Sequence, residues 1–300
     1  MAFSDLGHLG AGGSSANNQN SLTVATVQAV GAEDLVVVAV SVDNRIAGGG
    51  DDLAVRSVTI GGVALTLARQ NATDLAAQAG SSVSVWFGQP GALASGVNIV
   101  ATFQTPVTAD ASALSSRLYS VTSGNLVTTE GSAAAEARSA TPGQLDVATA
   151  NHSAVRVRAI GCEFDGSQSL IITPSWTAWN EAASAANGTT NEQVLEVESR
   201  VLVGTSSPSN PSLGSGCDNA SVYVAFQDRW TVLQLQNAMN YAVWYSEDRY
   251  LPLSGVVDEN TRRSIREFER IWEWPITGQI TPQLLAALEA EMARKNIANY

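Results

Sequence analysis

Short apolar runs with a period of two dominate the sequence from residue 21 to residue 227. In 193–203 (QVLEVESRVLV), valine and leucine alternate in part with glutamate and arginine, as expected of a strand with one buried face and one wet face. Because turn residues separate these runs, we predict that each is a β-strand. The predicted strands lie at 21–30, 34–44, 53–60, 63–70, 81–88, 96–103, 117–122, 154–164, 193–203 and 220–227. Many short strands without helical periodicity between them predict a large β-sandwich or jelly-roll domain over residues 21–227.

Small residues mark three further features of this part of the chain. Gly61-Gly62 separates two of the predicted strands, which is the signal of a two-residue hairpin. The stretch 131–143 (GSAAAEARSATPG) fits either a short helix or an alanine-rich loop. Residues 7–20 are rich in glycine, serine and asparagine, so we expect residues 1–20 to form a flexible N-terminal arm or docking segment.

After residue 228 the apolar period lengthens to about three and a half residues, which predicts helices. The repeat includes Val232, Leu235, Met239 and Val243, then Thr261, Ile265, Phe268 and Trp272, and finally Leu285, Leu288 and Met292. Asp258 is the predicted N-cap of the second helix. Thr281-Pro282 supplies an N-cap and a proline at the first position of the third helix. We therefore predict a small three-helix C-terminal domain over residues 228–300.

The C-terminal domain contains an internal repeat. Residues 253–257 (LSGVV) precede the second predicted helix, and residues 276–280 (ITGQI) precede the third. A hydrophobic-x-Gly-x-hydrophobic turn leading into a capped helix, used twice after a first helix, resembles the peptidoglycan-binding domain family. The positions that carry the resemblance are Leu235-Gln236, Gly255, Thr261, Phe268-Glu269, Gly278 and Leu284-Leu285-Leu288. The resemblance implies a three-helix fold that binds cell-envelope glycan, either peptidoglycan or capsule.

The sequence departs from that family pattern at several positions. Ser254 replaces the usual aspartate, Val257-Asp258 lacks the second glycine of the first turn, and Glu269 stands where glutamine is common. The tract 244–252 also lengthens the first connection. A three-helix scaffold can be kept as a docking module after its ligand is lost, so glycan binding is the part of the resemblance that needs a test.

The region before the C-terminal domain has a resemblance of its own. It begins with the glycine- and asparagine-rich tract and continues with 34–38 (DLVVV) and 83–87 (VSVWF). Residues 20–227 resemble β-sandwich domains of tailed-phage and gene-transfer-agent virion proteins, such as head spikes, fibres and decoration proteins. The resemblance implies a homo-oligomer on the virion surface, in contact with other virion proteins.

Charge and hydropathy narrow the choice of partners. The formal net charge is -12, with Lys295 as the single lysine, so we expect no nucleic-acid partner. The acidic excess lies mostly before the C-terminal domain, since residues 1–227 carry -10 and residues 228–300 carry -2. No apolar run approaches the roughly 20 residues of a membrane-spanning helix, so no membrane partner is expected. The start, MAFSDLG, lacks the features of a secretory signal, and we expect assembly in the host cytoplasm and exit by lysis or within a particle.

The residues available for catalysis favour a protein that is not an enzyme. His8 and His152 are the two histidines of the chain, whereas zinc peptidases and amidases generally cluster two or three of them. No Gly-x-Ser-x-Gly elbow surrounds a serine, which argues against a Ser-His-Asp hydrolase. Glu163 and Asp165 fit a glycosidase pair, solvated carboxylates beside a turn, or a cation ligand. A polysaccharide-active enzyme with its site in the β domain therefore remains an alternative.

Metal, cofactor and disulfide sites have little support in the sequence. Asp43, Asp51 and Asp52 flank a glycine run, a weak indication of a calcium loop, so we expect neither metal nor cofactor. Cys162 and Cys217 both follow glycine and form either a disulfide or two buried free thiols. The second alternative is favoured because cysteine is among the most buried residue types.

Aromatic residues gather in the C-terminal domain and indicate a sugar-binding surface, since aromatic rings suit the apolar faces of sugars. We assign Trp272 mainly to packing. Tyr241, Trp244 and Tyr245 lie in or beside the lengthened connection, so they are the predicted ligand-binding residues. Arg262 is added because arginine can bind peptide carboxylates. The hypothesis is a non-catalytic virion surface protein that binds glycan, and the alternative is a decoration protein whose helices dock other subunits.

Overall fold

The computed structural model places the chain in two compact units. It describes residues 3–15, 19–43, 55–73, 81–103, 111–121, 125–138, 140–149, 153–163, 170–180, 182–183, 193–214, 217–243, 251–255 and 257–295. The β unit contains residues 1–121 and 129–227, and the helical unit contains residues 122–128 and 228–300. The segment 122–128 thus belongs to the helical unit, although the sequence interpretation placed it in the β domain. Antiparallel sheets followed by three helices confirm the predicted mainly β fold with a helical C-terminal part.

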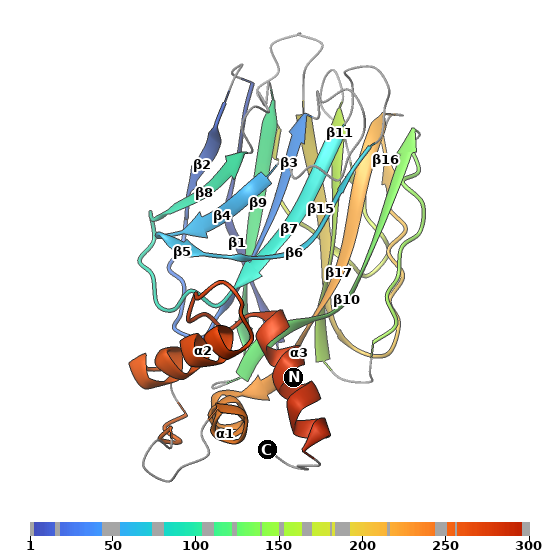
Figure 1. Ribbon diagram of the computed structural model, residues 1–300. Coiled ribbons are helices and arrows are strands. Elements are labelled where there is room, and N and C mark those ends of the chain that lie inside the picture. The colour runs from blue at the N-terminus through green and yellow to red at the C-terminus, as the bar shows by residue number, and fades with distance from the viewer. Residues whose placement is uncertain are drawn as a thin grey trace. The chain divides into compact units, whose positions relative to one another are not determined.

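Three large sheets make up the β unit (Figure 1). The five-stranded sheet has the order β1 (Phe3–Ser14), β9 (Ser112–Val121), β3 (Leu35–Asp43), β7 (Ser81–Gly88) and β6 (Thr66–Ala72). The four-stranded sheet has the order β2 (Ser21–Ala25), β8 (Asn98–Phe103), β4 (Val55–Ile60) and β5 (Val63–Ala64). The six-stranded sheet contains β10 (Asn125–Arg138), β17 (Asp218–Thr231), β11 (Ser153–Glu163), β15 (Gln193–Val203), β13 (Thr177–Ala178) and β14 (Ala182–Ala183). A short pair is formed by β12 (Leu170–Ile171) and β16 (Ser212–Leu213).

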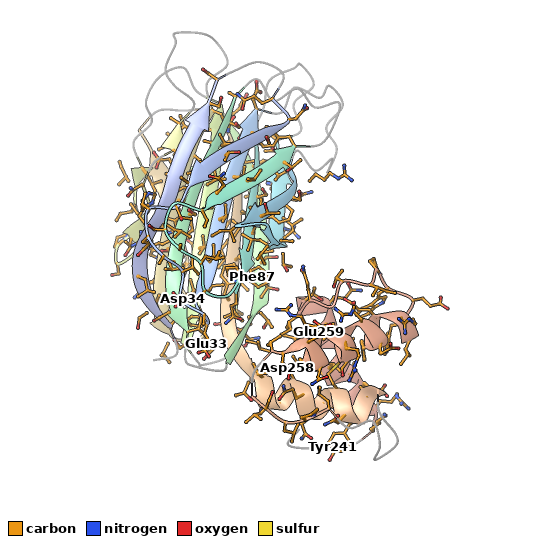
Figure 2. All side chains as sticks on the ribbon, turned by 90° about the vertical axis from the view of Figure 1, so that its left-hand side faces the viewer. Glu33, Asp34, Phe87, Tyr241, Asp258 and Glu259 are labelled. Atoms are coloured by element: carbon orange, nitrogen blue, oxygen red, sulfur yellow. The ribbon has the colours of Figure 1, made fainter. Side chains whose placement is uncertain are left out.

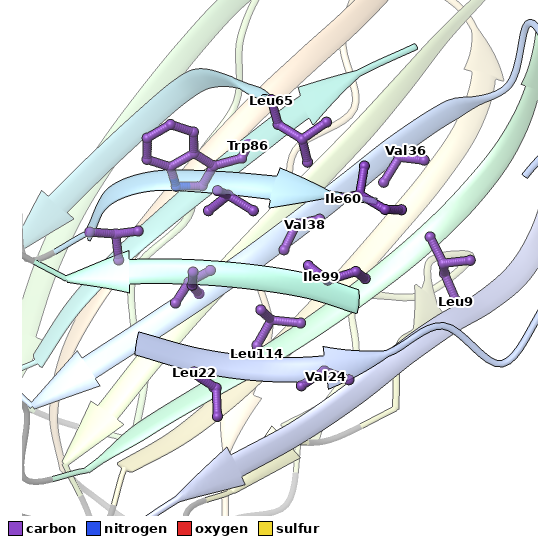
Figure 3. Packing of buried hydrophobic residues seen from close by; sticks show 14 of the residues in the cluster. Leu9, Leu22, Val24, Val36, Val38, Ile60, Leu65, Trp86, Ile99 and Leu114 are labelled. Carbon is purple, nitrogen blue, oxygen red and sulfur yellow. The ribbon is translucent and has the colours of Figure 1, made fainter. Parts of the chain in front are cut away.

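The main hydrophobic core lies between the four-stranded and five-stranded sheets (Figure 3). Every residue of β3 is buried, because this strand is central and both of its faces are covered. Alternate residues of β3 point into this core, namely Val36, Val38, Val40 and Val42. They pack against side chains of the facing sheet such as Leu22, Ile60 and Ile99. The nearly continuous apolar run in β3 is therefore the expected sequence of a strand buried on both sides.

The opposite face of the five-stranded sheet packs on the six-stranded sheet. The Phe87 and Phe226 rings contact each other with centroids 5.0 Å apart. Gln193 of β15 reaches across to β3 and β7, and its Nε2 donates hydrogen bonds to the hydroxyls of Ser41 and Ser81. Gly161 of β11 makes this close approach possible, since a Cβ there would lie 2.5 Å from Ser81 Oγ and 2.6 Å from Ser41 Oγ. The sandwich thus has three layers, with the five-stranded sheet in the middle.

Residues 3–14, which make up most of the predicted flexible arm, are a β-strand. Residues 3–14 form β1, which pairs antiparallel with β9 along its whole length. Leu9 is buried in the main core, and Arg117 forms an ion pair with Asp5 at 2.7 Å. Glycine is favourable here because a Cβ on Gly10 would lie 2.9 Å from the carbonyl oxygen of Ala25. The prediction was wrong because backbone hydrogen bonds to β9 stabilise this strand without requiring many apolar side chains.

Two local predictions have clear outcomes. Gly61 and Gly62 both have positive φ, 55° and 83°, and they join β4 to β5 through the pair Ile60 and Val63. The two-residue hairpin is confirmed, because only glycine adopts two successive positive φ values without strain.

Residues 131–138 continue the strand β10, so this alanine-rich stretch is neither a helix nor a loop there. A Cβ on Gly131 would lie 2.3 Å from a side-chain carbon of Val147, which explains a glycine inside this strand.

The helical unit contains α1 (Val232–Val243), α2 (Glu259–Ile271) and α3 (Pro282–Arg294). Asp258 caps α2 by accepting a hydrogen bond from Thr261 N at 2.8 Å. Thr281 caps α3 by accepting from Leu284 N at 3.1 Å. Both predicted caps are confirmed. The three helices bury one apolar core, which includes Leu126, Leu235, Met239, Ile265, Phe268, Leu285, Leu288 and Met292. Within the residues described, no helix has the length and apolar character needed to cross a membrane.

Candidate functional site

The two glycine turns of the helical unit are built in the same way. Gly255 has a φ of 71° and Gly278 a φ of 67°, so both adopt the left-handed backbone that glycine tolerates without a steric cost. At the first turn, the buried amide of Gln236 in α1 is the anchor. Its Nε2 donates to Ser254 Oγ at 2.9 Å, and its Oε1 accepts from Gly255 N at 3.0 Å.

The second turn uses a carboxylate instead of an amide. Glu269 is buried near the end of α2 and accepts hydrogen bonds from Thr277 N at 2.7 Å and Gly278 N at 2.8 Å. The Thr277 hydroxyl also donates to this carboxylate. Gln236 and Glu269 therefore hold equivalent turns, and the internal repeat of the sequence is also a repeat of hydrogen bonding. Because their polar atoms are used inside the unit, both residues position the turns rather than face a ligand.

Each turn also leaves one aliphatic side chain on the surface. Leu253 is 53% exposed and Ile276 is 54% exposed, while the hydrophobic residues at the other end of each turn, Val257 and Ile280, pack against the core. An isolated exposed leucine or isoleucine is ordinary on a protein surface. Ile276 is of more interest because an aromatic cluster precedes it closely in the chain.

The aromatic cluster lies at the C-terminal end of α2. The Trp272 ring stacks on Phe268 with centroids 5.4 Å apart and an interplanar angle of 18°. Trp274 contacts both rings, at 5.9 Å from Phe268 and 5.6 Å from Trp272. Trp272 is nevertheless 42% exposed, and its neighbour Ile271 is 61% exposed. The prediction that Trp272 serves mainly in packing is therefore only partly correct, because the ring stacks on the core residue Phe268 but also presents part of its surface to solvent.

A strained residue holds the two tryptophans in place. Glu273 has a φ of 56°, in the left-handed region that costs a residue with a Cβ about 1–2 kcal/mol. The chain reverses there through hydrogen bonds from Trp272 N to Phe268 O at 3.0 Å and from Trp274 N to Glu269 O at 2.8 Å. This reversal allows Trp272 and Trp274 to contact the same phenylalanine. We call Ile271, Trp272, Trp274 and Ile276 the aromatic surface of the helical unit.

Replacing Glu273 with glycine is expected to stabilise the helical unit by about 0.5–1 kcal/mol, because glycine adopts a positive φ without steric cost. Thermal unfolding of the full chain measures the effect. Glu273→Ala is the matched control, since it removes the same carboxylate but keeps the Cβ and hence the strain. A gain in stability from alanine equal to that from glycine would show that the carboxylate, not the backbone, is the cause.

The predicted ligand-binding residues do not form one described surface. Tyr241 is 39% exposed near the end of α1, where Lys295 Nζ donates to its carbonyl oxygen. Arg262 is exposed in the first turn of α2. Figure 2 shows Tyr241 well separated from Asp258 and Glu259 at the start of α2. Trp244 and Tyr245 lie outside the described residues. The sequence did not reveal the partial exposure of Trp272, because helical spacing predicts a core position for it.

Compared with known proteins, the chain matches no family model, no curated protein and no solved structure. The function is therefore inferred from the geometry of the chain itself. Two places in the structure concentrate polar or aromatic chemistry. One is the aromatic surface of the helical unit, and the other is a buried polar network in the β unit.

The buried network lies on the face of the six-stranded sheet that points away from the middle sheet. Arg158 of β11 pairs in register with Glu198 of β15. The Arg158 guanidinium donates to the carbonyl oxygens of Gly143 at 2.7 Å and Ser209 at 3.0 Å. Glu198 accepts from Thr173 N at 2.7 Å and also from the Ser209 hydroxyl. These bonds tie the covering loops to the sheet.

The same network includes further polar side chains. Arg156 donates to Gly204 O at 2.8 Å, and Tyr223 donates to Ser207 O at 2.9 Å. Burial lowers the pKa of Arg158, and the nearby Glu198 carboxylate opposes that shift. Burial also raises the pKa of the Tyr223 hydroxyl. Because these groups are covered and bond mainly to loop backbone, we interpret the network as a structural one that fixes the loops.

The histidines and carboxylates that were candidates for catalysis or metal binding are described only in part. His8 lies in β1, where burial and Arg117 lower its pKa. Asp43 is buried at the end of β3, and Glu163 ends β11. Their proposed companions Asp51, Asp52, His152 and Asp165 lie outside the described residues. Within the part of the chain that is described, no three histidine, cysteine, aspartate or glutamate side chains gather to hold a metal ion.

Proposed function

We propose that the helical unit binds cell-envelope glycan and that the chain is a non-catalytic virion surface protein, a head spike or fibre subunit. The observation that carries glycan binding is the partly exposed Trp272 ring, held against Phe268 and Trp274. A flat aromatic face packs well on the apolar face of a sugar ring. Because neighbouring rings already fix the indole, little side-chain entropy is lost when a sugar binds.

The paired glycine turns support the same proposal. Their shared hydrogen bonding to Gln236 and Glu269 is what a genuine structural repeat requires, so the internal repeat on which the proposed resemblance rests is present in the contacts as well as in the sequence. The virion assignment rests on the sequence resemblance of residues 20–227. Homo-oligomerisation and contact with other virion proteins belong to that part of the proposal.

A docking role is the second candidate, because two exposed aliphatic residues flank the tryptophans in the chain. Ile271 and Ile276 are both more exposed than Trp272. Branched aliphatic groups contribute strongly to protein interfaces through burial of apolar area. In this alternative the chain is a decoration protein, and the aromatic surface contacts another virion subunit.

Trp272→Ala is expected to weaken binding of the full chain to purified cell wall or capsule by about tenfold to a hundredfold, as loss of a central aromatic contact commonly costs 1–3 kcal/mol. Sedimentation with the insoluble wall, or fluorescence titration with soluble capsule, measures the loss. Trp272→Phe keeps an aromatic face and is expected to retain most of the affinity. Thermal unfolding of each variant separates loss of contact from loss of fold.

The controls distinguish the candidate functions. Tyr241→Ala and the double replacement of Trp244 and Tyr245 by alanine test the surface predicted from sequence, and a loss confined to these variants would move the site there. If wild-type chain binds no wall or capsule preparation, the glycan proposal is wrong and docking takes its place. Cleavage of the polysaccharide by the full chain would instead favour an enzyme with a site in the β unit.

A further inference from the structure

The β unit brings its two cysteines together. Cys162 lies near the end of β11, and Cys217 lies immediately before β17. In the β11–β17 register Cys162 is opposite Asn219, whose Nδ2 donates to the Cys217 carbonyl oxygen at 3.2 Å. Both cysteines are buried in one hydrophobic cluster with Ile160, Val194 and Leu213, and both are free thiols. Their side chains are hydrogen-bonded to each other, so the two sulfurs are neighbours.

The two thiols differ in pKa and in accessibility. The hydrogen bond donated by the Cys162 thiol lowers the pKa of Cys217, and the same bond together with burial raises the pKa of Cys162. Cys162 is completely buried, whereas Cys217 is slightly accessible. The thiolate is the nucleophile in thiol–disulfide exchange. Cys217 is therefore suited to react first, with Cys162 beside it as the resolving thiol.

We propose that Cys162 and Cys217 are a modification site at which an intramolecular disulfide forms when the chain meets an oxidising environment. The oxidant is a low-molecular-weight disulfide. The Cys217 thiolate attacks one of its sulfur atoms and releases one thiolate, leaving a mixed disulfide. Cys162 then loses its proton and attacks the Cys217 sulfur, which forms the protein disulfide and releases the second thiolate. Both protein thiols are oxidised, and one small disulfide is reduced to two thiols.

The cross-link would close a long loop around the buried polar network. The segment between the two cysteines contains Thr173, Glu198 and Ser209, which hold the covering loops on the six-stranded sheet. A disulfide across a long loop removes conformational entropy from the unfolded chain. The β unit is therefore expected to be more stable when oxidised. This inference is independent of glycan binding, because it concerns a different unit.

Incubation of the reduced full chain with oxidised glutathione tests the proposal. Peptide mapping is expected to show one peptide pair joined through Cys162 and Cys217, and the melting temperature is expected to rise by about 5–15 °C. A reducing agent should reverse both changes. Unreacted thiols, a lasting glutathione adduct on Cys217, or cross-links between chains would overturn the proposal, as would an intramolecular cross-link without any gain in stability.

Two serine variants supply the matched controls. In Cys162→Ser the first step remains, so a glutathione adduct is expected to persist on Cys217. In Cys217→Ser the first nucleophile is absent, so Cys162 is expected to react far more slowly. Neither variant should gain stability on oxidation. The reverse pattern, with the adduct accumulating on Cys162, would contradict the assigned order, and the wild-type peptide map still decides the proposal if a variant fails to fold.

Discussion

Arg158→Met is expected to destabilise the β unit by about 3–5 kcal/mol, because Arg158 is a buried cation near the buried Glu198 carboxylate, and removing a buried charge leaves a nearby opposite charge poorly compensated. Glu198 would lose the guanidinium that faces it across the β11–β15 register. The carbonyl oxygens of Gly143 and Ser209 would each lose the hydrogen bond that the guanidinium donates, although Ser209 O would keep the one from Leu145 N. Chemical denaturation of the full chain, followed by near-ultraviolet circular dichroism, measures the change.

A double variant shows whether the missing charge is the cause. Glu198→Gln removes the carboxylate charge, so adding it to Arg158→Met is expected to destabilise the protein by less than the sum of the two single replacements. Arg270→Met is a control for the loss of an arginine from an exposed ion pair with Glu267, and its expected cost is below about 1 kcal/mol. Strictly additive effects of the two network replacements would mean that Arg158 and Glu198 act independently.

Gly278→Val is expected to destabilise the helical unit by about 2–4 kcal/mol, combining backbone strain with a steric clash. Gly278 has a positive φ, which a β-branched residue adopts only at high cost. An added Cβ would lie 3.0 Å from side-chain atoms of Arg266 and 3.3 Å from the backbone oxygen of Arg262. The movement needed to relieve this contact would also disturb the hydrogen bond from Gly278 N to Glu269.

A valine at the other glycine turn, Gly255, separates the effect of backbone strain from the effect of a steric clash. Gly255 has nearly the same φ, but an added Cβ would meet only the Leu233 side chain, at 3.6 Å. Gly255→Val is therefore expected to destabilise the unit, but by less than Gly278→Val. Gly255→Ala and Gly278→Ala repeat the comparison with the smallest side chain that has a Cβ. Equal melting temperatures for the wild type and both valine variants would show that neither turn needs its positive φ.

Local features of the fold could be predicted from sequence because neighbouring residues determine them. The caps Asp258 and Thr281 accept hydrogen bonds from backbone groups three residues later, so the spacing alone identifies them. The same holds for Gly61-Gly62, where two positive φ values require glycine. Helical periodicity likewise identified all three C-terminal helices, since one face of each must meet a common core.

Features that depend on distant partners could not be predicted in this way. The glycine-rich β1 is ordered by pairing with β9, more than a hundred residues later. The segment 122–128 belongs to the helical unit through contacts such as that of Leu126 with the helical core. The residues of these two segments do not by themselves predict these structures. The partner strand of β1, and the core that Leu126 contacts, determine them more strongly than the local propensity of the segments does.

The sequence by itself determined the fold class, the three C-terminal helices with two of their caps, and the repeated turns of this protein, because apolar periodicity, caps and glycines act over a few neighbouring residues. Only the tertiary structure decided which side chains meet: that Arg158 faces Glu198 beneath the loops, that Cys162 contacts Cys217, and that Trp272 stays partly exposed. Burial and charge pairing depend on positions in space of residues far apart in the chain. A pattern of residue types cannot specify those positions.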